Sequence, residues 1–279
     1  MTEMERHYDE IALDCCFGHE AQQTSLDIIS NNLSNINTTG YKKETAEFRS
    51  LLYQNIQKQT TDTNGQEKPI GAQVGLGVKV AAVGTTFKQG NFATTDGAFD
   101  FAINGKGFFM IEQPDGSIAY TRNGNFQLSV NTSGGLTLST SDGYAVLDST
   151  GNPITFDANV DTTKLTFDNY GNIKYVDATG NAQNLGIAIG IAQYNNPAGL
   201  EKMGDSYFKE SVASGTPRIE GQDANLQRSV VKNGYLESSS VQAVDEMVDM
   251  IVTQRAYEMN SKAITASDEM LQQANNLRS

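Results

Sequence analysis

The sequence predicts an α+β protein in which a discontinuous, coiled-coil-like helical domain from both termini brackets an inserted β-rich domain of short hairpins and extended connecting segments. Three observations predict this fold. Each end of the chain carries an apolar stripe at helical spacing, the middle alternates as half-buried strands do, and Asp-Gly and Asn-Gly turns recur there. The expected domains are residues 1–59 (N-terminal helical part, with 1–19 atypical), 60–95 (extended linker), 96–190 (compact β domain), 191–233 (extended return segment) and 234–279 (long C-terminal helix).

The N-terminal helix is expected over about residues 21–36, because large aliphatic residues recur there at steps of three and four, the spacing of a narrow coiled-coil seam. The stripe consists of Leu26, Ile29, Leu33 and Ile36. The helix is expected to end before Gly40, which can adopt the positive φ of a helix C-terminus. A second helical segment with Phe48, Leu51 and Leu52 on one side is expected to follow.

Side-chain amides crowd the terminal segments, although asparagine is a poor helix former. Two interpretations stay open at this point. Amides can hydrogen-bond to neighbouring helices or line a wet channel, or they can be solvated surface residues. The residues concerned are Asn31, Asn32, Asn35, Gln254, Asn260, Gln272 and Gln273.

The middle of the chain predicts short strands joined by tight turns. The segments "QVGLGVKVAAV" and "KLTFDNYGNIKYV" alternate with strand period, and turns such as "QPDGS", "TRNGN" and "DSTGN" punctuate the region. In "FAINGKGFF", Gly105 and Gly107 are interpreted as turn or hinge positions. They lack the strand-turn-helix context and the Ser or Thr that a phosphate-binding loop requires.

The C-terminal segment predicts one long helix, since Tyr235 to Ser279 contains neither Gly nor Pro. A helix of about 35 residues spans on the order of 50 Å, and Ser239 with Gln242 can form a capping box at its start. Two helices bury too little core to be stable alone, so we expect the remaining apolar surface to pack against further copies. The predicted inter-helix and inter-subunit packing residues here are Val241, Val244, Val248, Ile251, Met259 and Met270.

Composition excludes several classes of protein. The net charge of −13 with a pI near 4.5 argues against binding to nucleic acid or to anionic lipid. No apolar run approaches the length of a membrane span, and no signal peptide is apparent at the N-terminus. If the protein leaves the cytoplasm, we expect a route that needs no cleaved signal.

The residues of an active site are not apparent either. The two histidines, His7 and His19, lie in the atypical N-terminal segment, and the adjacent Cys15 and Cys16 cannot easily form a disulfide with each other. We therefore expect no enzyme activity, no cofactor and no metal. The rival from a different class is a secreted β-rich carbohydrate-binding protein, which would leave the helical termini without explanation.

Three long segments resemble the axial proteins of the bacterial flagellum, a family of rod, hook and hook-associated subunits. "LDIISNNLSNINTTGYKKETAEFRSLLYQ" is similar to their N-terminal signature. "FAINGKGFFMI" with "YTRNGNFQLS" is similar to the start of their β domain, and the segment from "GYLESSSVQ" to "ASDEML" to their C-terminal helix. Within the family the chain looks most like the distal rod subunits, with a sister rod subunit or a hook-type protein as alternatives.

The resemblance implies a structural subunit that polymerises helically into a hollow shaft, which transmits torque and encloses an export channel. It implies a place in the periplasmic rod of the basal body, reached through the flagellar type III apparatus without a cleaved signal. The implied partners are the chain itself, proximal rod subunits, hook protein, the surrounding rings and a rod-capping muramidase. Residues 60–95 are expected to bridge neighbouring subunits. Residues 1–19 depart from the family pattern and are expected to be irregular or badly packed.

Overall fold

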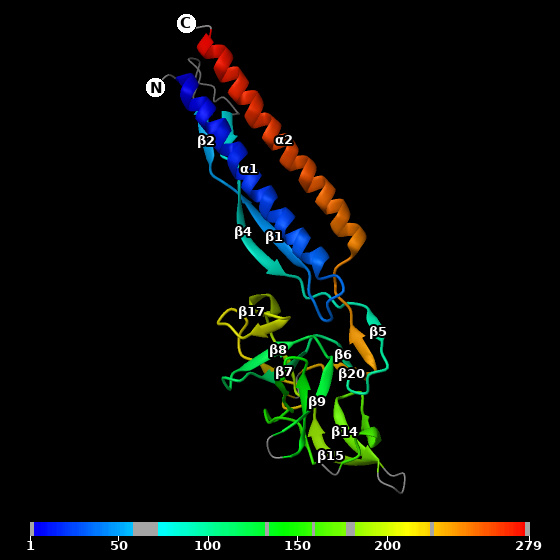
Figure 1. Ribbon diagram of the computed structural model, residues 1–279. Helices are drawn as coiled ribbons and strands as arrows, with labels where there is room; N and C mark the ends of the chain where they lie inside the picture. Colours follow the sequence, from blue (N-terminus) through cyan, green and yellow to red (C-terminus); the bar gives the residue numbers. More distant parts are fainter. Residues whose placement is uncertain are drawn as a thin grey trace. The chain divides into compact units, whose positions relative to one another are not determined.

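The computed structural model describes residues 3–57, 72–131, 134–157, 160–176, 182–223 and 226–276. Helices lie at the two ends of the chain and strands between them (Figure 1), so the predicted α+β class is confirmed. Contacts divide the chain into two units. The terminal unit comprises Met1–Ser34, Glu44–Thr85 and Gln242–Ser279, and the β-rich unit comprises Asn35–Lys43 and Thr86–Val241.

The terminal unit combines both long helices with paired strands. Helix α1 covers Glu3–Ser34 and α2 covers Ala243–Asn276, and the two lie side by side (Figure 1). Strand β1 (Glu44–Ser50) pairs antiparallel with β4 (Val78–Thr85), and β2 (Tyr53–Gln57) pairs with β3 (Ala72–Gly75).

The prediction of a second helix before residue 59 is therefore wrong, because residues 44–50 and 53–57 form strands. The register places Phe48 opposite Val80, and β-branched and aromatic residues such as these favour paired strands. The pairing partner lies about thirty positions further along the chain, beyond the reach of a local helical pattern. The central part of the expected linker, residues 58–71, lies outside the described residues.

Helix α1 is longer at its start than expected. The backbone of residues 3–19 is helical, so the expectation of an irregular segment is wrong, whereas the packing of the side chains before residue 16 lies outside the described residues. Residues 3–17 contain neither Gly nor Pro and are rich in good helix formers. The helix ends at Ser34, where a run of asparagine and threonine favours turns. Helix α2 begins at Ala243; the Ser239 hydroxyl accepts a hydrogen bond from the Val241 amide instead of forming the expected capping box.

The β-rich unit is built on a sheet that has ten strands among the described residues. Its main path runs β12-β10-β11-β7-β8-β18-β17, with β9 paired to β10, β16 to β7 and β19 to β16. The strands are β7 (Phe108–Glu112), β8 (Ile118–Thr121), β9 (Phe126–Val130), β10 (Leu136–Thr140), β11 (Ala145–Val146), β12 (Thr155–Phe156), β16 (Ile191–Gln193), β17 (Glu201–Gly204), β18 (Tyr207–Lys209) and β19 (Arg218–Ile219).

Smaller sheets complete this unit. A three-stranded sheet contains β13 (Leu165–Phe167), β14 (Asn172–Val176) and β15 (Ala182–Ala188). Strand β6 (Phe101–Asn104) pairs with β20 (Val230–Asn233), and β5 (Phe92–Thr94) pairs with β21 (Tyr235–Glu237). Short 3₁₀ helices cover Thr162–Lys164 and Pro197–Gly199. Residues 191–233 thus contribute strands to this unit, so the division differs from the expected 96–190 domain.

Strand β7 lies at the centre of the core, because side chains on both of its faces are buried. Phe109 and Ile111 belong to one hydrophobic cluster with Phe101, whereas Phe108 and Met110 belong to a second cluster. Since successive side chains of a strand point to opposite faces, this strand is covered on both sides. A strand buried on both faces needs no polar side, and its sequence "FFMI" is accordingly a continuous apolar run instead of an alternation of apolar and polar residues.

Candidate functional site

The face of α2 that meets α1 carries a polar residue at every seventh position, with apolar residues between them. Its buried and half-buried positions recur at steps of four and three, the spacing of a helix-helix seam. His19 stacks on Tyr257 with ring centroids 3.8 Å apart, and a Cβ at Gly18 would lie only 3.1 Å from Nδ2 of Asn260. These contacts pair the helices in antiparallel order. We call this face the polar seam; it consists of Glu246, Met250, Thr253, Tyr257, Asn260, Ile264 and Ser267.

Asn32 joins three elements of the terminal unit. It is 1% exposed, and its side-chain amide donates to the Glu44 carbonyl at 2.9 Å and to Oε2 of Glu246 at 3.2 Å. Its side-chain oxygen accepts a hydrogen bond from the Glu44 amide at 2.9 Å. Asn32 therefore pairs with the backbone of β1 as a neighbouring strand would, while also holding α2. Burial differs among the side-chain amides singled out in the sequence. Asn32 is buried, Asn35 and Asn260 are half-buried, and Asn31, Gln254, Gln272 and Gln273 are exposed.

Most large apolar residues of α2 lie away from the polar seam, which itself includes Met250 and Ile264. Val244, Val248 and Ile251 are 68%, 54% and 59% exposed. These side chains recur at steps of three and four between Val244 and Val252, so they share one face of the helix. We call this surface the apolar stripe; it consists of Val244, Met247, Val248, Ile251, Val252, Met259 and Met270.

The predicted packing residues are thus distributed over different places. In α1, Ile29 is buried, and Leu26 and Leu33 are half-buried. Ile36 and Val241 belong to the β-rich unit, where Val241 is 7% exposed. The remaining predicted positions are on the apolar stripe: Val244, Val248, Ile251, Met259 and Met270.

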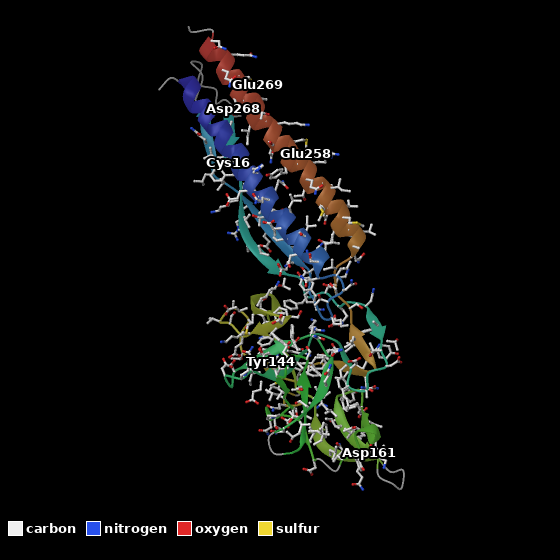
Figure 2. All side chains as sticks on the ribbon, viewed as in Figure 1. Cys16, Tyr144, Asp161, Glu258, Asp268 and Glu269 are labelled. Carbon is white, nitrogen blue, oxygen red and sulfur yellow. The ribbon has the colours of Figure 1, made fainter. Side chains whose placement is uncertain are left out.

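Charged residues also line the exposed part of α2. Figure 2 shows Glu258, Asp268 and Glu269 along this helix, and all three are exposed. Glu258 pairs with Arg255 at 2.8 Å. Cys16 is exposed on α1 (Figure 2), and the described residues contain no cluster of metal-ligating side chains. None of the described helices is long and apolar enough to span a membrane.

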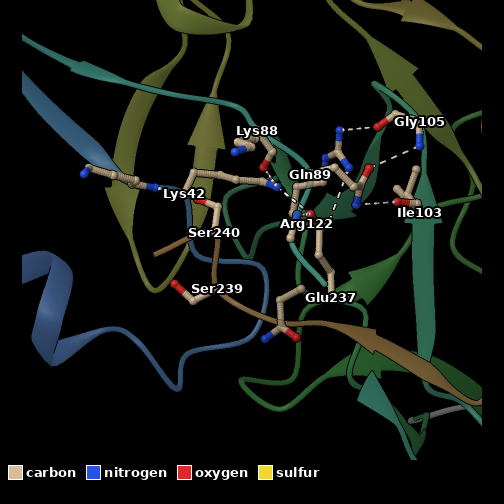
Figure 3. Close-up of polar contacts among 12 residues, drawn as sticks. Lys42, Lys88, Gln89, Ile103, Gly105, Arg122, Glu237, Ser239 and Ser240 are labelled. Atoms are coloured by element: carbon tan, nitrogen blue, oxygen red, sulfur yellow. Dashed lines mark hydrogen bonds and ion pairs between the residues drawn. The ribbon is translucent and has the colours of Figure 1, made fainter. Parts of the chain in front are cut away.

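A second site is a buried ionic cluster within the β-rich unit, which we call the junction (Figure 3). The side chain of Glu237 is completely buried, and its Oε1 accepts hydrogen bonds from Lys42 Nζ at 2.5 Å and from the Gly90 amide at 2.8 Å. Its Oε2 accepts a hydrogen bond from Arg122 at 3.3 Å. Lys42 also donates to the Lys88 carbonyl and Arg122 to the Gly105 carbonyl.

Burial dominates the electrostatics of the junction. It lowers the pKa of the Lys42 ammonium, and the attraction of Glu237 opposes this shift. Burial likewise lowers the pKa of Arg122, against the opposing attraction of Glu237 and of the more distant Glu220. The Arg122 guanidinium also lies over the Phe108 ring, 5.0 Å from its centroid. Removing charged groups from water is expensive, so this cluster depends on all its partners being present.

The junction ties together the segments by which the chain enters and leaves the β-rich unit. The Gly40 amide donates to the Glu237 carbonyl at 2.8 Å, and the Lys43 amide donates to the Ser240 hydroxyl at 2.9 Å. The Thr86 amide donates to the Lys43 carbonyl at 2.9 Å. Residues from three distant parts of the sequence are thereby fixed to one another.

The predicted turn glycines lie around this junction, where space is short. Gly40 has a φ of 70°, and a Cβ there would lie 2.6 Å from the backbone of Arg122. A Cβ at Gly105 would lie 2.4 Å from the Ser229 hydroxyl, and one at Gly107 would lie 2.2 Å from Ile191. These glycines allow close approach of neighbouring segments.

Sequence reasoning missed the polar seam and the junction. A signal for the seam exists, since Glu246, Thr253, Asn260 and Ser267 recur every seven residues. No comparable signal marks Glu237, whose partners Lys42 and Arg122 lie 195 and 115 positions away.

Three family descriptions match successive parts of the chain. "Flagella basal body rod protein" matches residues 18–42, "Flagellar hook protein FlgE/F/G D1 domain" matches 102–175, and "Flagellar basal body rod FlgEFG protein C-terminal" matches 232–277. The first covers the end of α1, the second the centre of the β-rich unit, and the third α2.

Full-length relatives agree with these matches. The chain is 43% identical to the flagellar basal-body rod protein FlgG of Borreliella burgdorferi, over 94% of this chain and 96% of the relative. It is 43% identical to FlgG of Agrobacterium fabrum, over 91% and 93%. It is 38% identical to FlgG of Bacillus subtilis, over 92% and 94%.

The fold and these matches define a structural protein of the flagellar rod and hook class, as the sequence resemblance predicted. Within that class the chain belongs to the FlgG family of flagellar basal-body rod proteins, the distal rod family. It is a structural rod subunit of the flagellar basal body.

Proposed function

We propose that this rod subunit polymerises with copies of itself into a helical tube, and that the apolar stripe of α2 is a principal contact between copies. The observation that carries the proposal is the exposure of Val248 and its neighbours, beside a helix seam that is polar. Burying a side chain of this size contributes about 1.5–3 kcal/mol, a gain that the single chain leaves unused. Repeated contacts that do not close into a ring build a filament.

In this polymer the paired terminal helices form a coiled-coil-like inner layer around an export channel, and the β-rich units form the outer layer. The antiparallel contacts between α1 and α2 support the pairing, and the exposed stripe supports further packing by neighbouring helices. The tube transmits torque as a drive shaft, a structural role without enzymatic activity.

The segment of residues 60–95, together with the strands β1 and β2 that pair with its strands β4 and β3, is proposed to bridge neighbouring subunits and to stiffen the tube. Leu52, Tyr53 and Val74 are 82%, 62% and 43% exposed on these strands or beside them, which supports a contact with another molecule. Deleting residues 60–75 and still obtaining a straight, rigid polymer would count against this role.

The further partners are proposed to be proximal rod subunits, hook protein, the surrounding rings and a rod-capping muramidase. The place of action is proposed to be the periplasm, reached by flagellar type III export without a cleaved signal. Membership of the basal-body rod family supports these assignments, and the acidic charge of −13 supports the absence of nucleic acid among the partners.

The test is an assembly assay on the full chain with Val248→Asp and the matched variant Gln254→Asp, since both positions are exposed on α2. Wild type and Gln254→Asp are expected to sediment as polymer. Val248→Asp is expected to remain monomeric with an unchanged circular dichroism spectrum. Assembly of Val248→Asp at the wild-type concentration would contradict the proposal.

A further inference from the structure

The β-rich unit contains a cavity of about 280 Å³ beside its hydrophobic core. Its floor includes Ile189 and Ile191, each 3% exposed, and Tyr170 and Arg228 line it as well. Ser149 and Gln222 add polar groups, and the Gln222 amide donates to the Ser149 carbonyl at 2.6 Å. The cavity therefore combines an apolar floor with a cation and several polar groups.

Arg228 supplies the positive charge of this cavity. Its guanidinium lies 5.9 Å from the centroid of the Tyr170 ring, and it has no hydrogen bond or ion pair among the described residues. Other arginines of the same unit differ: Arg218 pairs with Asp223 at 2.6 Å, and Arg122 belongs to the junction. An arginine beside a cavity with its donors unused is available to an incoming anion.

The carboxylate of Glu220 also lines the cavity, and its oxygens are hydrogen-bonded to other groups. Its oxygens accept hydrogen bonds from the Ser229 amide at 2.6 Å, the Ser229 hydroxyl at 2.7 Å and Gln193 at 2.7 Å. It also interacts electrostatically with Arg122. Both Glu220 oxygens are therefore hydrogen-bonded, whereas Arg228 is exposed and keeps its donors free of partners among the described residues.

We propose that this cavity receives an aspartate or glutamate side chain from a second copy of the chain, with the carboxylate on Arg228 and the aliphatic stem over the isoleucine floor. The guanidinium fork matches a carboxylate in two-point contact. A volume of about 280 Å³ lies just below the range of small-molecule sites, which begins near 300 Å³, and suits one side chain. The chain has 33 acidic and 20 basic residues, so copies offer carboxylates in excess. The inference rests on the proposed polymer.

The first test places the photo-crosslinking amino acid p-benzoylphenylalanine at position 170, and separately at position 248, in the full chain. Irradiation of polymer is expected to link position 170 to a peptide of another copy at or beside an Asp or Glu. Links from position 248 without links from position 170 would overturn the cavity contact while leaving the polymer intact. Absence of links from both positions would overturn the cavity contact and the apolar-stripe contact, whereas failure of the wild-type chain to form sedimenting polymer would overturn the proposed function itself.

The second test compares Arg228→Glu with Lys106→Glu, which makes the same charge change at another exposed position of the unit. Arg228→Glu is expected to raise the critical concentration for assembly about tenfold, and Arg228→Lys to raise it less. Added salt should weaken wild-type assembly more than that of Arg228→Glu. Equal effects of Arg228→Glu and Lys106→Glu would overturn the proposal, because only a general charge effect would then remain.

Discussion

The side-chain amide of Asn32 in α1 donates a hydrogen bond to Oε2 of Glu246 in α2 at 3.2 Å, although the residues are 214 positions apart. The same amide pairs with the backbone of Glu44 in β1. A single buried polar residue of α1 thus contacts both α2 and β1, whereas most large apolar residues of α2 are exposed on its other side.

Replacing Asn32 with leucine should destabilise the terminal unit, because the backbone of Glu44 loses both of its bonds from this side chain. The expected cost is about 2–3 kcal/mol, the cost of leaving buried polar groups without their partner. Hydrogen exchange of the α1 and β1 amides measures it. Asn31→Leu, at an exposed position on the same turn, is the control and should change exchange little. An equal response of both variants would contradict the role given to Asn32.

Replacing Glu237 with alanine should destabilise the β-rich unit, since Lys42 and Arg122 would stay buried without their carboxylate. Breaking a buried ion pair in this way costs about 3–5 kcal/mol. Urea unfolding followed by near-ultraviolet circular dichroism of the 11 tyrosines reports the change, as the chain lacks tryptophan. Glu201→Ala, at an exposed position on β17, serves as the control. A loss for Glu237→Ala no larger than for the control would show that the junction adds no stability.

Replacing Gly40 with alanine should be far more damaging than the same change at Gly116. Both glycines have positive φ, of 70° and 78°, so both variants incur the backbone strain of about 1–2 kcal/mol. Only Gly40 is also crowded, with the backbone of Arg122 2.6 Å from the added carbon, whereas Gly116 has open space. Thermal unfolding of the two variants separates strain from crowding. Equal melting temperatures would mean that the close approach at Gly40 relaxes without cost.

Stability should fall at alkaline pH, in part because of Tyr207. Burial and the hydrogen bond to Asp142 raise its pKa, so the unfolded chain loses this proton at lower pH than the folded protein does. The contribution is fully present below about pH 10 and is lost as pH rises toward the folded pKa. The lowered pKa of Lys42 has the opposite effect, since it makes the stability rise with pH below pH 10.5. This effect is the same in wild type and in a Tyr207 variant, so it cancels when the two are compared.

The measurement for Tyr207 is the free energy of unfolding at several pH values between about pH 9 and about pH 11, for wild type and Tyr207→Phe. The wild-type curve should fall more steeply than that of the variant. Parallel curves would mean that this hydroxyl titrates alike in the folded and unfolded chains.

The sequence predicted those helices and hairpins that are determined by residues close together in the chain. Helix α2 follows from a long segment without Gly or Pro, and the Asp-Gly and Asn-Gly turns marked hairpins such as β7–β8. The pairing of β1 with β4 could not be predicted in this way, because "ETAEFRS" also fits a helical face and its partner begins at Val78. The spacing of apolar residues describes a single segment. The choice between helix and strand at this position depends on a second segment, the strand that pairs with it.

The candidate site was predictable in part for the same reason. The spacing of Val244, Val248 and Ile251 identified an apolar stripe, but spacing alone could not tell which neighbour covers it. The structure assigns the seam with α1 to polar residues such as Glu246 instead. The burial of Glu237 depends on cations brought from distant segments, and no pattern within "YLE" shows this.

Cryo-electron microscopy of polymer assembled from the full chain can show what covers the apolar stripe of each copy. We expect a helical tube in which Val248 and Ile251 of each α2 are buried against helices of neighbouring copies. A chain that stays monomeric at high concentration with both helices ordered would contradict it, as would a polymer in which these side chains still face solvent.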